Sequence, residues 1–144
     1  MSVSVGKKVP DFTAPAMAGP FSLASVSGRT LVLYFYPKDN TPGCTSQASD
    51  FRDLAGEFDK AGATIVGVSR DSLKSHEGFR RKFDLPFELI SDADETVCTL
   101  FGVIKMKNMY GKQVRGIERS TFVVDDKGVM RGEWRGVKVR GHVD

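Results

Sequence analysis

The run of residues 30–36 limits the fold of this chain more than any other segment. It reads Thr-Leu-Val-Leu-Tyr-Phe-Tyr and contains no charged or turn-forming residue. β-Branched and aromatic residues favour a strand, and an apolar run without alternation is typical of a strand buried on both faces. Such a strand lies at the centre of a sheet with helices on both sides. Because 144 residues is the length of one domain, we predict a single α/β domain spanning residues 1–144.

The rest of the chain alternates between strand and helix patterns. A helix is predicted from Pro42 to just before Gly62, because apolar residues recur there at helical spacing and glycine ends many helices. Ser72 is predicted to cap a second helix, and Asp92 with Glu95 to form an acidic capping box for a third. The predicted inward-facing residues are Phe51, Leu54, Ala55 and Phe58 in the first helix and Leu73, Phe79 and Phe83 in the second.

Four further strands are predicted, at residues 64–69, 87–90, 120–124 and 129–134. Residues 11–14 and 21–23 form a hairpin-like N-terminal extension, and residues 106–114 are predicted to be a loop. The order predicts a central mixed sheet that is flanked by helices, with an antiparallel hairpin at its C-terminal end.

Composition excludes several classes of protein. Two cysteines are too few for a disulfide-stapled scaffold or a four-cysteine zinc site, and the two histidines are too few for a metal centre. No glycine-rich nucleotide motif follows a strand, so we expect no metal, flavin or nicotinamide cofactor. A net charge of +3 gives no reason to expect a nucleic-acid partner. Neither a membrane span nor an apolar leader is present, so we expect a cytoplasmic protein.

Cys44 stands where a thiol becomes reactive. Thr41 is a suitable helix cap and Pro42 suits the first helical position, so Cys44 falls in the first turn of the predicted helix. Backbone N–H groups and the helix dipole favour a thiolate there, and the thiolate is the nucleophilic form. The spacing alone fits a reactive cysteine and a buried structural cysteine equally well.

Residues 35–45 favour a reactive Cys44 because they resemble a segment of a known family. They read Phe-Tyr-Pro-Lys-Asp-Asn-Thr-Pro-Gly-Cys-Thr and resemble the active-site loop of peroxiredoxins, in particular the bacterioferritin-comigratory (PrxQ) subfamily. Pro37, Thr41 and Cys44 match the signature of the family. Residues 9–12, 67–72, 89–92 and 119–122 resemble further family blocks in the family order, so the resemblance covers nearly the whole chain. It implies a thioredoxin-like fold.

The resemblance also implies a role for each matched residue. Cys44 would be the peroxidatic nucleophile that reduces hydrogen peroxide and alkyl hydroperoxides and becomes a sulfenic acid. The Thr41 hydroxyl would hold the peroxide, and Arg119 would lower the thiol pKa and stabilise the transition state. Pro37 would shield the sulfur from water, and the backbone N–H groups of Gly43 and Cys44 would complete the substrate pocket.

The chain departs from the subfamily at the resolving cysteine. Many members have a second cysteine five residues after the first, where this chain has Ser49. Serine there fits a one-cysteine enzyme recycled by thioredoxin, glutaredoxin or a small thiol, and equally an engineered replacement. Cys98 is the other candidate resolver, although an unpaired cysteine is more often a small buried hydrophobe. We expect a monomer, which ends before the final helix that relatives have.

Two other functions are kept as alternatives. A thiol–disulfide oxidoreductase usually needs a Cys-x-x-Cys pair, whereas Thr45, Ser46 and Gln47 follow Cys44. A redox sensor without enzymatic activity would share Cys44, but it would not need Thr41 and Arg119 at the sulfur.

Overall fold

The computed structural model describes residues 5–17, 19–23, 28–37, 39, 42–60, 62–109 and 112–134. Within these ranges, the side chains of residues 42–44, 55, 59, 105, 107–109, 112–115 and 134 are not described. Thr41, His142 and the C-terminal residues 135–144 therefore lie outside the described part of the chain.

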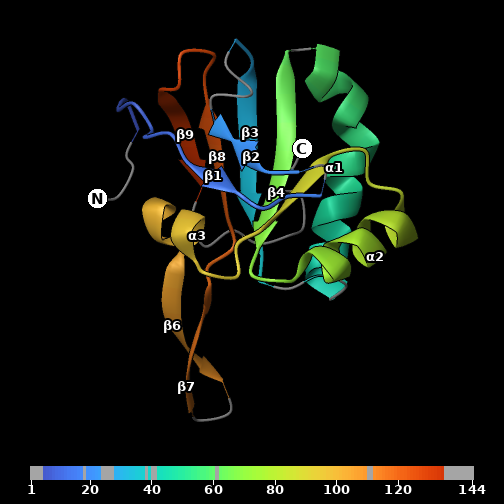
Figure 1. Ribbon diagram of the computed structural model, residues 1–144, viewed down its shortest axis with the longest axis vertical. Coiled ribbons are helices and arrows are strands. Elements are labelled where there is room, and N and C mark those ends of the chain that lie inside the picture. Colours follow the sequence, from blue (N-terminus) through green and yellow to red (C-terminus); the bar gives the residue numbers. More distant parts are fainter. Residues whose placement is uncertain are drawn as a thin grey trace.

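A five-stranded mixed sheet forms the centre of the molecule, with strand order β5-β4-β3-β8-β9 (Figure 1). β3 is the middle strand, as its apolar run predicts. It pairs in parallel with β4 and antiparallel with β8. The strands are β3 (Thr30–Phe35), β4 (Ala63–Ser69), β5 (Glu88–Ser91), β8 (Ser120–Val124) and β9 (Met130–Trp134).

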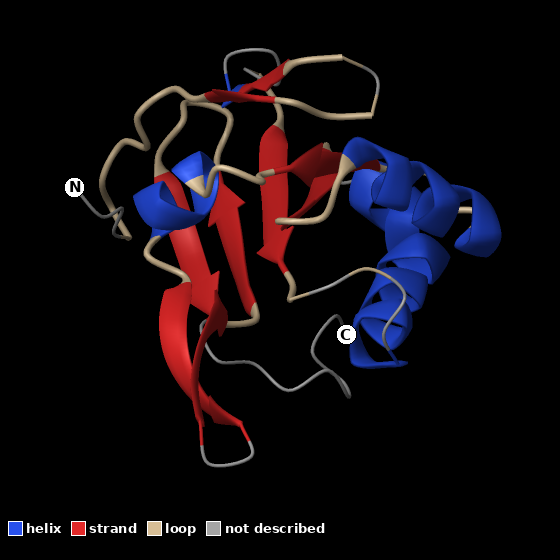
Figure 2. Ribbon diagram, turned by 60° about the horizontal axis from the view of Figure 1, so that its bottom comes forward, coloured by secondary structure: helices blue, strands red, loops and turns tan. Residues whose placement is uncertain are grey.

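Helices cover both faces of this sheet (Figure 2). α1 (Pro42–Lys60) and α2 (Leu73–Phe83) pack through Phe51 and Phe79 on the face that holds the even-numbered residues of β3. α3 (Thr96–Phe101) packs on the opposite face with the odd-numbered residues. Both faces of β3 are thus buried, which confirms the predicted mixed sheet flanked by helices.

Two small hairpins lie outside the central sheet. β1 (Thr13–Ala14) and β2 (Phe21–Ser22) pair antiparallel near the N-terminus, as predicted. β6 (Ile104–Met109) and β7 (Lys112–Ile117) form an arm that projects from the sheet (Figure 1). The prediction of a loop at residues 106–114 is therefore wrong. Among the described residues, β6 and β7 pair with each other and with no other strand, and Met106 is 61% exposed. Of the described side chains, only those at the base of the arm reach the core, through Ile104 and Ile117, so residues 106–114 carry no apolar alternation that would predict strands.

The helix boundaries follow the predicted signals in part. The Ser72 hydroxyl accepts a hydrogen bond from the Ser75 N–H, so Ser72 caps α2 as predicted. Gly62 follows α1 with φ +79°, a left-handed conformation that glycine adopts readily. The prediction that Leu73 faces the core is wrong, because Leu73 is 41% exposed. It is the first residue of α2 and lines a surface pocket with Pro15 and Pro20 of the N-terminal segment.

The start of α3 differs from the predicted capping box. The Asp92 carboxylate accepts hydrogen bonds from the N–H groups of Val97 at 3.0 Å and Cys98 at 2.7 Å, and the Asp94 carboxylate accepts one from the N–H of Thr96 at 3.2 Å. Glu95 instead forms an ion pair with Arg70 at 3.0 Å. In the described part of the chain, no helix has both the length and the apolar character that crossing a membrane requires.

Gly67 lies at a position of the sheet where the neighbouring side chains leave no room for a Cβ atom. It lies on β4 between Tyr34 of β3 and Leu89 of β5, and a Cβ atom would come within 2.8 Å of the Tyr34 ring and 2.9 Å of Leu89. We expect Gly67→Ala to lower the free energy of unfolding by about 1–3 kcal/mol in urea titrations, because overpacking strains the core.

Gly56→Ala is the matched control for that substitution. A Cβ at this exposed position of α1 meets no atom within 4 Å among the described residues. It should raise the free energy of unfolding by about 0.5–1 kcal/mol, because alanine favours the helix. Equal effects of the two substitutions would contradict this account of the packing at Gly67.

Candidate active site

The candidate site lies where β3 leads into α1. β3 ends at Phe35, and half-buried Pro37 follows it. α1 begins at Pro42, so Cys44 is its third residue and belongs to the first helical turn. That turn contains no acidic residue, so no side chain within it opposes the positive end of the helix dipole. The Cys44 side chain and all of Thr41 lie outside the described residues.

Arg119 is brought to this place by the pairing of β8 with β3. Ser120 is the register partner of Phe35, so Arg119 precedes β8 beside the end of β3. One Arg119 guanidinium nitrogen donates a 2.6 Å hydrogen bond to the side-chain oxygen of Gln47, which is fully buried on α1. Gln47 follows Cys44 by three residues, so the two positions lie on one face of the helix.

Gln47 is a site residue that no motif in the sequence marks. Its one available signal is its spacing of three from Cys44, which a helical reading places on the same face. Because Arg119 can only donate, the oxygen of the Gln47 amide must face the guanidinium. The amide therefore has a fixed orientation, and it anchors the cation one helical turn after Cys44.

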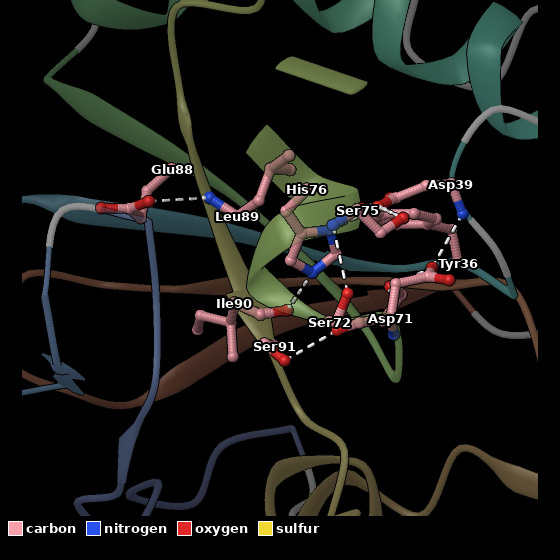
Figure 3. A network of polar contacts seen from close by, with 11 residues as sticks. Tyr36, Asp39, Asp71, Ser72, Ser75, His76, Glu88, Leu89, Ile90 and Ser91 are labelled. Atoms are coloured by element: carbon pink, nitrogen blue, oxygen red, sulfur yellow. Dashed lines mark hydrogen bonds and ion pairs between the residues drawn. The ribbon is translucent and has the colours of Figure 1, made fainter. Parts of the chain in front are cut away.

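A buried polar cluster holds the segment before α1 (Figure 3). We name it the Asp39 cluster, and it consists of Tyr36, Asp39, Asp71, Ser75 and His76. The Asp39 carboxylate accepts hydrogen bonds from the Tyr36 hydroxyl at 2.6 Å and the Ser75 hydroxyl at 2.9 Å. His76 Nδ1 lies 2.7 Å from the same carboxylate. Tyr36, Asp39 and His76 are all buried.

The cluster continues to the ends of two neighbouring strands. The Asp39 N–H donates to the Asp71 carboxylate at 2.8 Å, and the Ser69 hydroxyl at the end of β4 donates to the same oxygen at 2.7 Å. His76 Nε2 lies 2.8 Å from the Ile90 carbonyl oxygen in β5. Burial raises the pKa of the Tyr36 hydroxyl well above its usual value, and Tyr34 and Asp39 raise it further. Tyr36 therefore stays protonated and acts as a donor.

No sequence pattern predicts this cluster. Asp39 lies within residues 35–45, which resemble an active-site loop, and the two histidines are too few to predict a metal centre. The available signal was the position of His76 on α2, three residues before the core residue Phe79, which places it on the buried face. By residue type, Asp39, Asp71 and His76 could also hold a metal ion, since their ligand atoms lie within 4.8 Å of one another. Hydrogen bonds already account for this grouping.

Cys98 lies apart from α1. It is fully buried in α3, on the sheet face opposite to α1. Burial raises the pKa of the Cys98 thiol, and the nearby Asp92 carboxylate raises it further. Ser49, the other resolving position considered, is half-buried on α1. The structure brings Arg119 and Gln47 together near the start of α1, but it does not bring Cys98 there.

Known proteins resemble this chain over most of its length. Residues 5–132 match the model of the AhpC/TSA family. Peroxiredoxin Bcp of Xanthomonas campestris is 58% identical over 123 residues, which cover 85% of this chain and 77% of that protein. Peroxiredoxin Bcp of Bacillus subtilis is 45% identical over 144 residues, covering 99% and 92% of the two chains.

A solved structure resembles the whole described fold. The bacterioferritin comigratory protein of Xanthomonas campestris, whose structures with trapped intermediate and ligand concern its alkyl peroxide reduction activity, is 51% identical with a TM-score of 0.91. The match covers 98% of this chain and 93% of that one. The chain therefore belongs to the AhpC/TSA family, as a peroxiredoxin of the Bcp/PrxQ type and hence a thiol-dependent peroxidase.

Proposed function

We propose that Cys44 is the nucleophile that reduces the peroxide. Its thiolate attacks one oxygen of a hydroperoxide, the O–O bond breaks, and the second oxygen leaves as water or an alcohol after taking up a proton. Cys44 becomes a sulfenic acid, so sulfur is oxidised as the peroxide is reduced. The observation that carries this proposal is the bond between Arg119 and Gln47, which anchors a cation one turn from Cys44.

The residues around the cysteine would share the remaining work. The Arg119 charge favours the thiolate over the thiol and stabilises the negative charge that develops on the peroxide oxygens. The backbone N–H groups of Gly43 and Cys44, at the start of α1, are the donors that a helix N-terminus offers to such charge. Thr41 would contribute its hydroxyl to the peroxide, and Pro37 would limit the access of water.

The substrates would be hydrogen peroxide and alkyl hydroperoxides. The Xanthomonas campestris relative has a studied alkyl peroxide reduction activity, which supports the second class. An external thiol would recycle the enzyme, whether thioredoxin, glutaredoxin or a small thiol, because Ser49 cannot form a disulfide and Cys98 is buried on the other face of the sheet. We further propose a monomer that works in the reducing cytoplasm.

Replacement of Arg119 tests the electrostatic part of the proposal. We expect Arg119→Met to lower the second-order rate constant for hydrogen peroxide by about a hundredfold, because one charge-stabilising donor is lost. The apparent pKa of the Cys44 thiol, read from the pH dependence of alkylation, should rise. Arg131→Met, which removes an exposed arginine on β9, is the control and should change the rate less than twofold. Unaltered kinetics in Arg119→Met would refute this role.

Intact-mass analysis after one equivalent of peroxide tests the recycling route. A one-cysteine enzyme should gain one oxygen atom, and added thiol should convert that product to a mixed disulfide at Cys44. Loss of two hydrogens, together with a Cys44–Cys98 peptide, would show instead that the chain resolves its own sulfenic acid. Cys44→Ser is the control and should leave the mass unchanged.

Cys98 should be unreactive as long as the protein is folded. Its raised pKa keeps it a neutral thiol at pH 8, so a disulfide reagent should modify one cysteine rapidly and the second only in denaturant. An unfolded cysteine ionises near pH 8.5, so this thiol supports folding fully below that pH and progressively less above it. The wild-type protein should lose unfolding free energy between about pH 8.5 and 10, and Cys98→Ala should lose less over the same range. Rapid modification of both thiols in the native protein would contradict the prediction.

A further inference from the structure

We propose that Asp39 and His76 are positioning residues for the peroxide reaction, which act as one unit to hold the segment between β3 and α1. The inference rests on the function proposed above for Cys44. The Asp39 cluster is distinct from the Cys44 thiol, from Arg119 and from the N-terminal N–H groups of α1, and we give it a role in positioning them.

Asp39 is fixed by both its side chain and its backbone. Its carboxylate accepts hydrogen bonds from the hydroxyl of Tyr36, the residue after β3, and from the hydroxyl of Ser75 in α2, and it bonds to His76 of α2. Its N–H donates to Asp71, in the connection between β4 and α2. Asp39 precedes Pro42, the first residue of α1, by three residues, and it precedes Cys44 by five. The cluster thus anchors the short segment that delivers Cys44 to its place.

Both ring nitrogens of His76 take part in hydrogen bonds. Nε2 faces the Ile90 carbonyl, which can only accept, so Nε2 carries a hydrogen. Nδ1 and the Asp39 carboxylate, 2.7 Å apart, share one further proton in a hydrogen bond. His76 is fully buried as well, so it cannot exchange a proton with a substrate in this arrangement. Its contribution to the reaction is therefore indirect, through Asp39.

Two physical arguments favour positioning over stability alone. A buried polar pair gains little stability over well-packed apolar residues, whereas a fully hydrogen-bonded network specifies one geometry. The attack on a peroxide needs the sulfur and the oxygen within about 3.5 Å and in line, and a misplacement of about 1 Å can cost about a hundredfold in rate. A fixed point three residues before α1 is well placed to control that geometry.

Two substitutions of His76 separate the bond to Asp39 from the bond to Ile90. An asparagine amide nitrogen takes the place of Nδ1, so His76→Asn can keep the contact with Asp39 and lose that with Ile90. A glutamine amide nitrogen takes the place of Nε2, so His76→Gln can keep Ile90 and lose Asp39. We expect His76→Gln to lower the second-order rate constant for hydrogen peroxide at least tenfold, and His76→Asn to recover most of that loss.

Substitutions of Asp39 and Tyr36 complete the test. Asp39→Asn should slow the reaction tenfold or more. The Asp39→Asn/His76→Gln double variant should be no slower than the worse single variant, because residues that act as a unit are not additive. Tyr36→Phe keeps the ring and removes one hydroxyl donor, so it should fold and react several-fold more slowly. Glu77→Gln, an exposed change beside His76 on α2, is the control and should react at the wild-type rate.

The outcomes distinguish the two proposals. Rates are measured per folded molecule, with folding checked by circular dichroism and thermal unfolding. If Cys44→Ser still consumes peroxide, the proposed function fails. If Cys44→Ser is inactive while Tyr36→Phe, Asp39→Asn and His76→Gln react at the wild-type rate, the positioning proposal fails. Equal rates for His76→Asn and His76→Gln would also overturn it, and Tyr36→Phe alone decides if the His76 variants do not fold.

Discussion

The pairing of β3 with a parallel strand on one side and an antiparallel strand on the other determines where the chemistry lies. Because β3, β4 and β5 are parallel, their carboxyl ends meet at one edge, and Ser69, Asp71 and Ser91 follow or end these strands there. Because β8 is antiparallel, its first residues reach the same edge and bring Arg119 with them. Residues distant in sequence thus converge on the segment that leads into α1.

The start of α1 is held from two sides. Behind it, Ala48 and Phe51 pack against the sheet, and Gln47 is bonded to Arg119. In front of it, the Asp39 carboxylate is buried and carries three hydrogen-bonding contacts from side chains. A buried carboxylate without such partners would be strongly unfavourable, so the position of residue 39 is tied to Tyr36, Ser75 and His76. A helix N-terminus that is fixed in this way suits a reaction that depends on alignment.

The sequence predicts the framework well, because the framework is built from apolar periodicity. The central strand, the helix after Pro42, the Ser72 cap and the C-terminal hairpin all have local signals, and all are present. The β6–β7 arm lacks such a signal because its polar, glycine-containing sequence shows no apolar alternation, and the described contacts with the core are made at its base by Ile104 and Ile117. The predictions that Leu73 faces the core and that Glu95 caps α3 are wrong. The neighbours of both residues come from distant segments, which are the N-terminal residues for Leu73 and Arg70 for Glu95.

Some residues of the candidate site can likewise be predicted from the sequence and others cannot. Cys44 and Arg119 are predicted through resemblance, whereas Gln47 and the Asp39 cluster depend on contacts across 36 to 72 positions of sequence, which no local pattern contains. Residue type alone could not assign His76, because a histidine on a buried helix face serves equally as a ligand, a base or a bridge between two segments. Its two nitrogens, one on a backbone carbonyl and one on a carboxylate, are what identify it as a bridge.

The placement of the second cysteine has a consequence for the catalytic cycle. Cys98 is fully buried on the sheet face opposite to α1, and burial together with Asp92 raises the pKa of its thiol, so we expect it to react slowly with an oxidant. The sulfenic acid proposed for Cys44 would therefore need a thiol from outside the chain to reduce it. A second cysteine at position 49 would lie about 7.5 Å further along the axis of α1, beyond disulfide reach in an intact helix. An internal disulfide there would require α1 to unwind locally, whereas recycling by an external thiol requires only that the thiol reach Cys44.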